Sequence, residues 1–363
     1  MKVCFYSPYF PDHFGGGERH VLDIATHLPP QMEATIAFPK REGEEINVAE
    51  LRTRYEKFYG AALAKITFSR CPINTSANFL QKLLWTKQFS DLFVVSDGSL
   101  FFSLARKNIA HLQIPFTNRF DGVFNRVKLQ QWQLNTNSHF TKTVIEAHWR
   151  CQVASVLQPM VDSALFSLPN KKEKIILHVG RFFTQLHSKR QDVLVENFRQ
   201  LLLTHPEFRS WRLELVGGVE DAQYFQKIKR ASLGLPITLH TDCSRAELLE
   251  LYSKASIYWH ATGFAVDEKL QPEKVEHFGI TTLEAMAAGA VPVVVAKGGQ
   301  REVLGAELLQ LAWESPTACI AQTKKLLENQ TLLQRYQQLA KERAVAFGEA
   351  RFTKQVAAIF SNT

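Results

Sequence analysis

The residues most able to do chemistry lie in one stretch of the sequence, EHFGITTLEAMAAGAVPVV (276–294). Its small and apolar residues predict a helix over about 279–288, followed by a strand. The backbone amides that open a helix have no partner within it, and with the helix dipole they attract phosphate. We expect four of these amides to bind a donor phosphate, namely those of Phe278, Gly279, Ile280 and Thr281.

Two carboxylates flank this predicted phosphate site. Glu276 lies in the loop before the helix and Glu284 lies one turn inside it. A carboxylate can accept hydrogen bonds from both hydroxyls of a vicinal diol. Two solvated helix charges would be the alternative, but a helix of Ala, Met and Gly is typical of a buried one. A phosphate with a polyol on each side is a nucleotide sugar, which is the ligand that the stretch predicts.

A second phosphate-binding pattern is FGGGERH (14–20), between a predicted strand over 3–6 and a predicted helix over 17–28. Gly16 and Gly17 allow close backbone approach next to a helix start, which favours anions. The dinucleotide-binding pattern G-x-G-x-x-G is absent. A tight connection without a ligand is the alternative explanation.

Two cations follow another predicted strand, in HVGRFFTQLHSK (178–189). Arg181 can bind a diphosphate with its planar fork and Lys189 can bind it as a point charge. Ordinary surface basic residues would look the same when taken singly. A place at a strand end, where parallel sheets bind ligands, favours the phosphate interpretation.

Short apolar runs alternate with amphipathic segments along the whole chain, which predicts an α/β fold with parallel sheets and helices on both faces. Polar residues and a proline over 162–175 predict an exposed linker. We therefore expect two Rossmann-like domains, 1–165 and 170–346, with sheets that face each other across a cleft. The last segment, 347–363, is predicted to be a helix that packs back on the first domain.

The predicted strands are 3–6, 34–38, 92–96, 109–112, 154–157, 174–180, 212–218, 237–240, 256–261 and 291–296, and the predicted helices include 17–28, 140–148, 189–203, 221–232, 245–254, 280–288 and 317–327.

Composition limits the class of protein. The chain is 45% hydrophobic and 21% charged, and no apolar run reaches the roughly 20 residues of a membrane span. Its five cysteines are scattered and never form C-x-x-C, which predicts reduced thiols in the cytoplasm. No Asp-x-Asp motif occurs, so we expect no catalytic metal ion and no cofactor.

The positive charge is concentrated in one region. Residues 50–150 hold fourteen basic and six acidic residues, which accounts for the whole net charge of +8. Such a region suits an anionic partner, although a solvated basic face without a partner is equally compatible with it. We favour peripheral contact with the cytoplasmic face of an anionic membrane and expect no nucleic-acid partner. Trp132, Trp149 and the stretch FLQKLLW (79–85) could insert at such a surface, but aromatic residues at helical spacing favour a core position.

Three blocks together resemble a known family. EHFGITTLEAMAAGAVPVV resembles the E-x7-E signature of the retaining GT-B glycosyltransferases of family 4 (group 1). SPYFPDHFGGGERHV (7–21) and the VGRF…SK block resemble that group's other two motifs, and the resemblance covers 1–345. GGGERHV and EHFGI are also similar to the group's lipid-linked-oligosaccharide mannosyltransferases. The resemblance implies a GT-B fold with an N-terminal acceptor domain and a C-terminal domain that binds the nucleotide sugar.

The resemblance also implies roles for individual residues. Arg181 and Lys189 would bind the diphosphate of a GDP- or UDP-linked sugar, Glu276 would contact the transferred sugar, and Glu284 would hold the ribose. Gly16 and Gly17 would lie near the phosphates, and His111 would match the family's first-domain histidine beside the sugar. The acceptor would be a glycan, a polysaccharide or a lipid-linked molecule.

Other interpretations stay open at this point. His260 could line the sugar site, although a buried structural histidine is the more common case. A nucleotide-sugar epimerase on the same architecture would need an acid–base pair of carboxylates in the first domain, and none is visible. A nicotinamide dehydrogenase lacks its glycine motif here. A non-catalytic sugar-nucleotide or RNA-binding protein need not retain Arg181, Lys189 and both glutamates.

Overall fold

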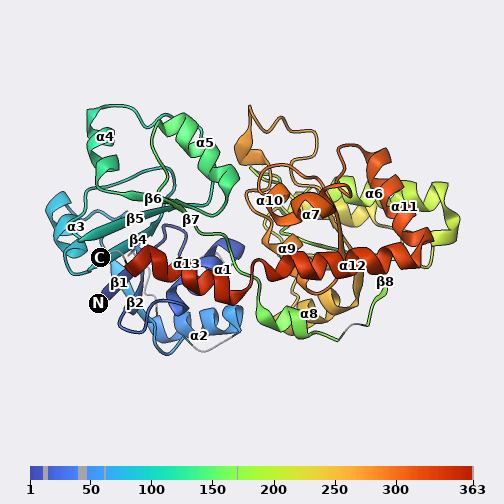
Figure 1. Ribbon diagram of the computed structural model, residues 1–363, viewed down its shortest axis with the longest axis horizontal. Helices are drawn as coiled ribbons and strands as arrows, with labels where there is room; N and C mark the ends of the chain where they lie inside the picture. Colours follow the sequence, from blue (N-terminus) through green and yellow to red (C-terminus); the bar gives the residue numbers. More distant parts are fainter. Residues whose placement is uncertain (11–14, 40–46, 61–62, 170, 362–363) are drawn as a thin grey trace. The chain divides into compact units, whose positions relative to one another are not determined.

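The structure is a computed structural model of the 363-residue chain. It describes residues 1–10, 15–39, 47–60, 63–169 and 171–361. The chain divides into two compact units, one of Met1–Met160 together with Ala350–Thr363 and one of Val161–Glu349. The C-terminal helix therefore belongs to the same unit as the N-terminus (Figure 1).

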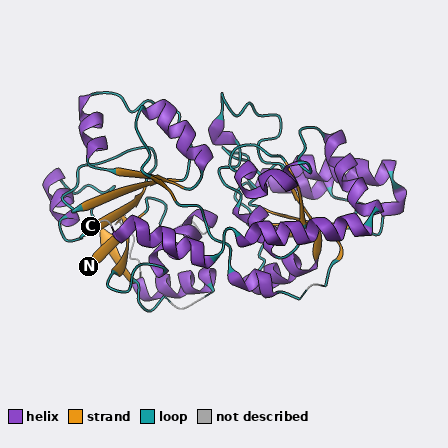
Figure 2. Ribbon diagram, viewed as in Figure 1, coloured by secondary structure: helices purple, strands orange, loops and turns teal. Residues whose placement is uncertain are grey.

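The first unit is built on one parallel sheet. Within the described residues it has seven strands in the order β3-β2-β1-β4-β5-β6-β7. Parallel neighbours need a crossover connection, and helices supply most of these crossovers (Figure 2). The strands are β1 (Lys2–Tyr6), β2 (Glu33–Pro39), β3 (Thr67–Cys71), β4 (Asp91–Val95), β5 (Lys107–Leu112), β6 (Gln133–Thr136) and β7 (Ser155–Val156). Helices α1 (Gly16–Thr26), α2 (Val48–Tyr59) and α13 (Glu349–Ser361) pack on one face, and α3 (Phe79–Thr86), α4 (Val123–Gln130) and α5 (His139–Trp149) pack on the other.

Strand β1 shows why this sheet is covered on both faces. Successive side chains of a strand point to opposite faces. Accordingly Phe5 lies in the cluster under α1, α2 and α13, whereas Tyr6 lies in the cluster under α3, α4 and α5. The ring of Phe360 lies 6.2 Å from that of Phe5, which anchors α13 to the sheet. Burying one such aromatic side chain stabilises the unit by about 1.5–3 kcal/mol.

The second unit repeats the plan with a smaller sheet. Its described residues form five parallel strands in the order β10-β9-β8-β11-β12. These strands are β8 (Glu173–Val179), β9 (Arg212–Val216), β10 (Ile237–His240), β11 (Ala255–His260) and β12 (Val291–Val294). The helices are α6 (Gln191–Thr204), α7 (Ala222–Ala231), α8 (Arg245–Lys254), α9 (Ile280–Ala287), α10 (Gln300–Leu309), α11 (Pro316–Glu328) and α12 (Gln330–Val345), with short 3-10 turns η1 (Ser163–Ser167), η2 (Pro206–Phe208) and η3 (Pro272–Lys274).

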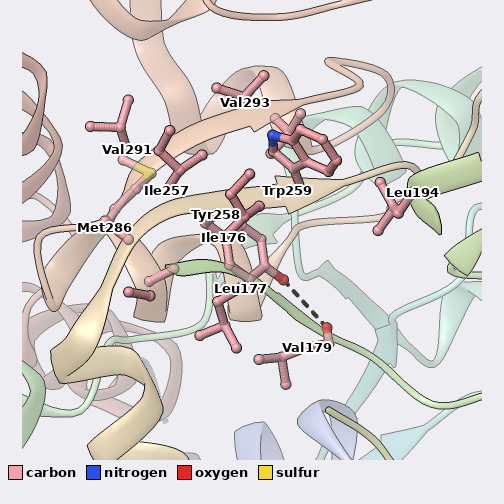
Figure 3. Packing of buried hydrophobic residues seen from close by; sticks show 14 of the residues in the cluster. Ile176, Leu177, Val179, Leu194, Ile257, Tyr258, Trp259, Met286, Val291 and Val293 are labelled. Carbon is pink, nitrogen blue, oxygen red and sulfur yellow. Dashed lines mark hydrogen bonds between the residues drawn. The ribbon is translucent and has the colours of Figure 1, made fainter. Parts of the chain in front are cut away.

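The core of the second unit centres on β8 and β11. Figure 3 shows their apolar side chains packed together with Met286 of α9 and Leu194 of α6. The buried hydroxyl of Tyr258 donates a hydrogen bond to the carbonyl oxygen of Val179 at 3.3 Å. A buried polar group is thereby satisfied inside an apolar cluster, close to the carboxyl end of β8.

In both units the strand order reverses once, between β1 and β4 in the first and between β8 and β11 in the second. Ligands of doubly wound sheets bind outside the carboxyl ends of the strands at this switch point. In the second unit β8 leads into Gly180 and β11 ends at His260. The switch point thus adjoins the stretch 178–189, which the sequence singled out, and the candidate residue His260.

The alternating strand and helix pattern is confirmed, but the sequence missed several elements. Strands β3 and β6 escaped notice because they are short and carry polar residues, as in TFSRC and QLNT. Helices α2, α3, α4 and α10 were also missed. Helix α4 buries none of its residues completely, so it has little of the apolar periodicity that marks a helix.

The exposed linker predicted over 162–175 is wrong in part. Leu165 is only 1% exposed and lies in the core of the second unit. The Asp162 carboxylate accepts a hydrogen bond from the backbone of Ala164 at 3.0 Å and so caps η1. The prediction relied on the proline and the lysines of this segment. The residues that pack into the core are its few apolar ones.

The core position expected for the aromatic residues is confirmed for Trp132 and Trp149, which are buried. It is wrong for part of the stretch 79–85, because Phe79 and Leu80 of α3 are more than half exposed. In the described ranges no helix combines the length and the apolar composition needed to cross a membrane.

Candidate active site

Glu276 lies between η3 and α9, and two side chains from distant segments hold its carboxylate. Lys189 Nζ and His260 Nε2 both contact Oε2, at 2.7 and 2.9 Å. Lys189 lies just before α6 and His260 ends β11. Among the described residues Oε1 has no hydrogen-bond partner. One oxygen is therefore fixed by the protein, and the other can accept hydrogen bonds from a ligand.

The charges around Glu276 follow from this geometry. Burial would raise the pKa of Glu276, but the Lys189 ammonium and the His260 hydrogen bond outweigh burial and hold that pKa well below its usual value. Burial lowers the pKa of His260 despite the nearby carboxylate. At neutral pH the ring is thus uncharged and donates its Nε2 hydrogen to an ionised Glu276. His260 therefore orients the carboxylate.

Further histidines lie around Glu276 and His260. His178 Nδ1 bonds the carbonyl oxygen of Trp259 at 2.9 Å, and burial together with His260 lowers the pKa of His178 to about 3. The rings of His187 and His277 lie 4.9 Å apart. Sequence reasoning missed His178 and His187, although both lie in the block that it singled out. Within the part of the chain that the structure describes, no group of three or more His, Cys, Asp or Glu side chains could hold a metal ion.

Arg181 follows β8, as the sequence predicted, but its guanidinium already has a partner. Its Nη1 lies 2.6 Å from Oε1 of Glu220, and its guanidinium lies 4.9 Å from the ring centre of Phe183. Arg181 and Glu220 are both more than a third exposed. Exposed pairs of this kind are weak, typically about 0–1 kcal/mol, so a diphosphate can replace Glu220 at small cost.

The start of α9 is shaped by Gly279. This residue has a φ of +107°, and a Cβ there would lie 2.7 Å from Oε1 of the buried Gln300. Only glycine fits this turn, which leads straight into the first amides of the helix. Ile280 and Thr281 open the helix, and the Thr281 hydroxyl is bonded to Tyr258 at 2.7 Å. The ring of Phe278 is buried, so this residue can offer a ligand only its backbone.

Glu284 has a different environment from Glu276, because both of its oxygens have protein partners. Arg245 Nη1 contacts Oε1 at 3.2 Å and the Tyr252 hydroxyl donates to Oε2 at 2.9 Å. Sequence reasoning missed Arg245 and Tyr252. They lie 39 and 32 positions from Glu284 in the chain, and neither belongs to a recognisable motif.

In the first unit the glycine motif opens α1, with Gly15 before the helix and Gly16 as its first residue. A Cβ on Gly17 would lie 2.4 Å from Oε1 of Gln113, whose Nε2 donates to the Gly17 carbonyl oxygen at 3.2 Å. A side chain at position 17 would therefore displace the Gln113 amide from its present position. Phe14 of the same motif lies outside the described residues. A phosphate contact at Gly16 and Gly17 stays a prediction.

His111 is fully buried inside β5. Its Nδ1 lies 2.5 Å from Oδ1 of Asn135, and its ring packs 5.1 Å from that of His20 and 5.2 Å from that of Phe93. Burial lowers the pKa of His111 to about 4. The expected contact of His111 with a sugar stays a prediction.

The family model of glycosyl transferases group 1 matches residues 164–343, just under half of the chain and all within the second unit. A search of curated proteins finds no match. The matched range contains Arg181, Lys189, Glu276 and Glu284.

Solved structures resemble the whole chain at low identity. A glycosyltransferase from Rickettsia africae has a TM-score of 0.72 at 16% identity and covers 100% of this chain and 99% of its own. Anabaena Alr3699/HepE in complex with UDP and glucose has a TM-score of 0.69 at 16% identity, with 100% of both chains covered. WaaG, a glycosyltransferase involved in lipopolysaccharide biosynthesis, has a TM-score of 0.65 at 14% identity, again with 100% of both chains covered. Residues 164–343 therefore resemble the glycosyl transferases group 1 family, and the chain has the α/β GT-B fold with two Rossmann-like domains.

Proposed function

We propose that this protein is a hexosyltransferase of family 4 type that moves a sugar from a nucleoside-diphosphate sugar to an acceptor hydroxyl. The observation that carries the proposal is the Glu276 carboxylate. Lys189 and His260 fix its Oε2, and its Oε1 is left to accept hydrogen bonds from the sugar of the donor. Glu284 holds the ribose, so the two carboxylates grip the donor on either side of its diphosphate.

The diphosphate interacts with Arg181, Lys189 and the backbone amides of Phe278, Gly279, Ile280 and Thr281. Negative charge grows on the departing diphosphate as the bond from the sugar's anomeric carbon to the phosphate oxygen breaks. Cations and amides aimed at that charge stabilise the transition state more than the ground state. These groups can supply the positive charge that a divalent ion supplies elsewhere, so we propose transfer without a metal ion or a cofactor.

We propose retention of the anomeric configuration. The acceptor oxygen bonds the anomeric carbon on the face that the diphosphate leaves, and the departing phosphate oxygen takes the acceptor's proton. No protein base is then required. We also propose that Gly16, Gly17 and His111 contact the donor.

The proposal is tested with a panel of UDP- and GDP-linked sugars, GDP-mannose included. One donor should raise the melting temperature, since a ligand at 100 times its dissociation constant stabilises a protein by about 2.7 kcal/mol. Product analysis with that donor and a glycan or lipid-linked acceptor should then show a new glycosidic bond of retained configuration. Epimerised donor without transfer would contradict the proposal, and so would salt-sensitive RNA binding without any donor effect.

We also propose that the acceptor is lipid-linked and that the first unit touches an anionic membrane from the cytoplasmic side. Phe79 and Leu80 of α3 and Val123 and Phe124 of α4 are all at least 60% exposed. The two helices adjoin through Phe102, whose ring lies 6.2 Å from that of Phe79 and 5.8 Å from Lys128 Nζ. Apolar side chains beside an excess of basic residues suit the interface of an anionic bilayer.

Vesicle sedimentation tests this contact. The protein should bind vesicles that contain phosphatidylglycerol and not vesicles of phosphatidylcholine alone, and Phe124→Glu should weaken binding about tenfold, because it removes an apolar contact and adds a repelled charge. Leu233→Glu is the matched control, since Leu233 is 74% exposed but lies in the second unit. Equal binding by both variants would contradict the proposal, and so would a dimer that Phe124→Glu dissociates.

A further inference from the structure

We infer that Arg245 and Tyr252 are positioning residues that orient Glu284 for a ribose diol and so determine whether the enzyme distinguishes ribonucleotides from 2′-deoxyribonucleotides. This inference rests on the proposed function, since it assumes that Glu284 meets the ribose of the donor. It assigns the selectivity of the nucleotide site to two residues of α8 that belong to none of the sequence motifs.

The two residues are presented by a single helix face. Arg245 is the first residue of α8 and Tyr252 lies seven residues later, which is two turns on the same side. Ser244 caps the helix and forms a capping box with Glu247, so the helix start that carries Arg245 is well fixed. Both side chains meet Glu284, which lies within α9. The carboxylate plane is thus set by a second, separately anchored helix.

The Glu284 carboxylate can accept more hydrogen bonds than the protein donates to it. A carboxylate offers about four lone-pair directions, two on each oxygen. Arg245 occupies one on Oε1 and Tyr252 occupies one on Oε2. Each oxygen therefore keeps one acceptor direction, and two adjacent hydroxyls are the group that uses one on each. The Glu284 side chain is 8% exposed, so the protein does not enclose it completely.

The partners of Glu284 are themselves held in place. Arg245 Nη2 contacts Oδ2 of Asp162 at 3.0 Å, so the guanidinium bridges two carboxylates. Tyr252 is fully buried, and burial together with the Glu284 charge raises its pKa, which keeps the hydroxyl protonated and donating. The Arg245 guanidinium and the Tyr252 hydroxyl are thus both held in place. Because they fix the Glu284 carboxylate, the fold also sets the directions of its two remaining lone pairs.

The test compares dissociation constants of UDP and 2′-deoxy-UDP, and of GDP and 2′-deoxy-GDP, by calorimetry. The wild-type protein should bind the ribonucleotide of its preferred base about tenfold or more tightly than the deoxy form, the scale of one hydrogen bond to a charged group. In Arg245→Met and Tyr252→Phe this ratio should fall to about threefold or less. Affinity for inorganic pyrophosphate should stay unchanged in both variants, because the phosphate-binding residues are intact. Tyr252→Phe removes a single hydroxyl, so it serves where Arg245→Met fails to fold.

Arg212→Met is the matched control, because Arg212 also bridges two carboxylates of the same unit, those of Glu173 and Glu214, and neither is Glu284. It should keep the wild-type ratio. Glu284→Gln distinguishes a failure of the positioning role from a failure of the proposed function. Suppose that the wild-type protein prefers the ribonucleotide and Glu284→Gln has lost this preference. If Arg245→Met and Tyr252→Phe then both keep the full preference, the positioning role is overturned and the proposed function stands. If neither the wild-type protein nor any variant binds a nucleotide, the proposed function itself fails.

Discussion

Glu276 and Glu284 come from one motif and lie eight positions apart, yet their carboxylates have different hydrogen-bond partners. Glu276 precedes α9 in a loop and is held on one oxygen by a lysine and a neutral histidine. Glu284 lies inside α9 and is held on both oxygens by an arginine and a tyrosine. The first arrangement suits a group that must respond to charge developing in a reaction. The second suits a group that must recognise a fixed shape.

The largest expected effect separates the two glutamates by their kinetics. Glu276→Ala should lower the rate of sugar transfer by about 100-fold or more, the scale for losing one electrostatic stabiliser of a transition state. The affinity for the free nucleoside diphosphate should change little, because the diphosphate cations remain. Initial rates with labelled donor and calorimetry with the nucleotide measure the two quantities.

The control for this variant is Glu250→Ala, a glutamate that is paired with Lys254 on the surface of the same unit. It should transfer at the wild-type rate. Near-normal transfer by Glu276→Ala would refute the role of Glu276 and remove the distinction between the two carboxylates.

A smaller expected effect is the pH dependence of stability, which also differs between the surroundings of the two glutamates. The environment of Glu276 contains His178, whose pKa is lowered to about 3, whereas Arg245 and Tyr252 beside Glu284 do not titrate in this range. An unfolded histidine titrates near 6.5, so between pH 6.5 and 3 the unfolded state binds the extra proton and stability falls as the pH falls. From pH 6.5 to 5 the free energy of unfolding should drop by about 2 kcal/mol for this one group.

Denaturant unfolding at pH 7, 6 and 5, with hydrogen exchange to follow each unit, checks this prediction. His111, with its pKa lowered to about 4, should give the first unit a similar loss. His178→Asn keeps a donor for the Trp259 carbonyl and removes the titrating ring, so the second unit should become less sensitive to pH. Equal stability at pH 7 and 5 would contradict the burial of both imidazoles.

The sequence predicts the parts of this fold and site that local patterns encode. The helix that begins near Gly279 and the strands β8, β11 and β12 could be located because runs of small and apolar residues leave local marks. The partners of Arg181 and Glu284 could not be predicted. Glu220 and Arg245 are ordinary surface-type residues whose contacts arise only from the packing of α7 and α8 on the sheet.

His111 shows a different limit of sequence reasoning. The sequence placed it at a strand end but could not give its neighbours, which are His20, Phe93 and Asn135. The exposed apolar residues of α3 and α4 show the reverse case. Phe79 and Phe124 have the residue type of a core, and only the fold reveals that the described residues leave both side chains mostly exposed.

A crystal structure of the protein with its intact sugar nucleotide would locate every part of the donor at once. The diphosphate should lie on Arg181, Lys189 and the first amides of α9, with hydroxyls of the sugar on Oε1 of Glu276 and the ribose diol on Glu284. Donor density away from these residues, or a ribose that leaves Glu284 untouched while the sugar points away from Glu276, would contradict this placement of the donor.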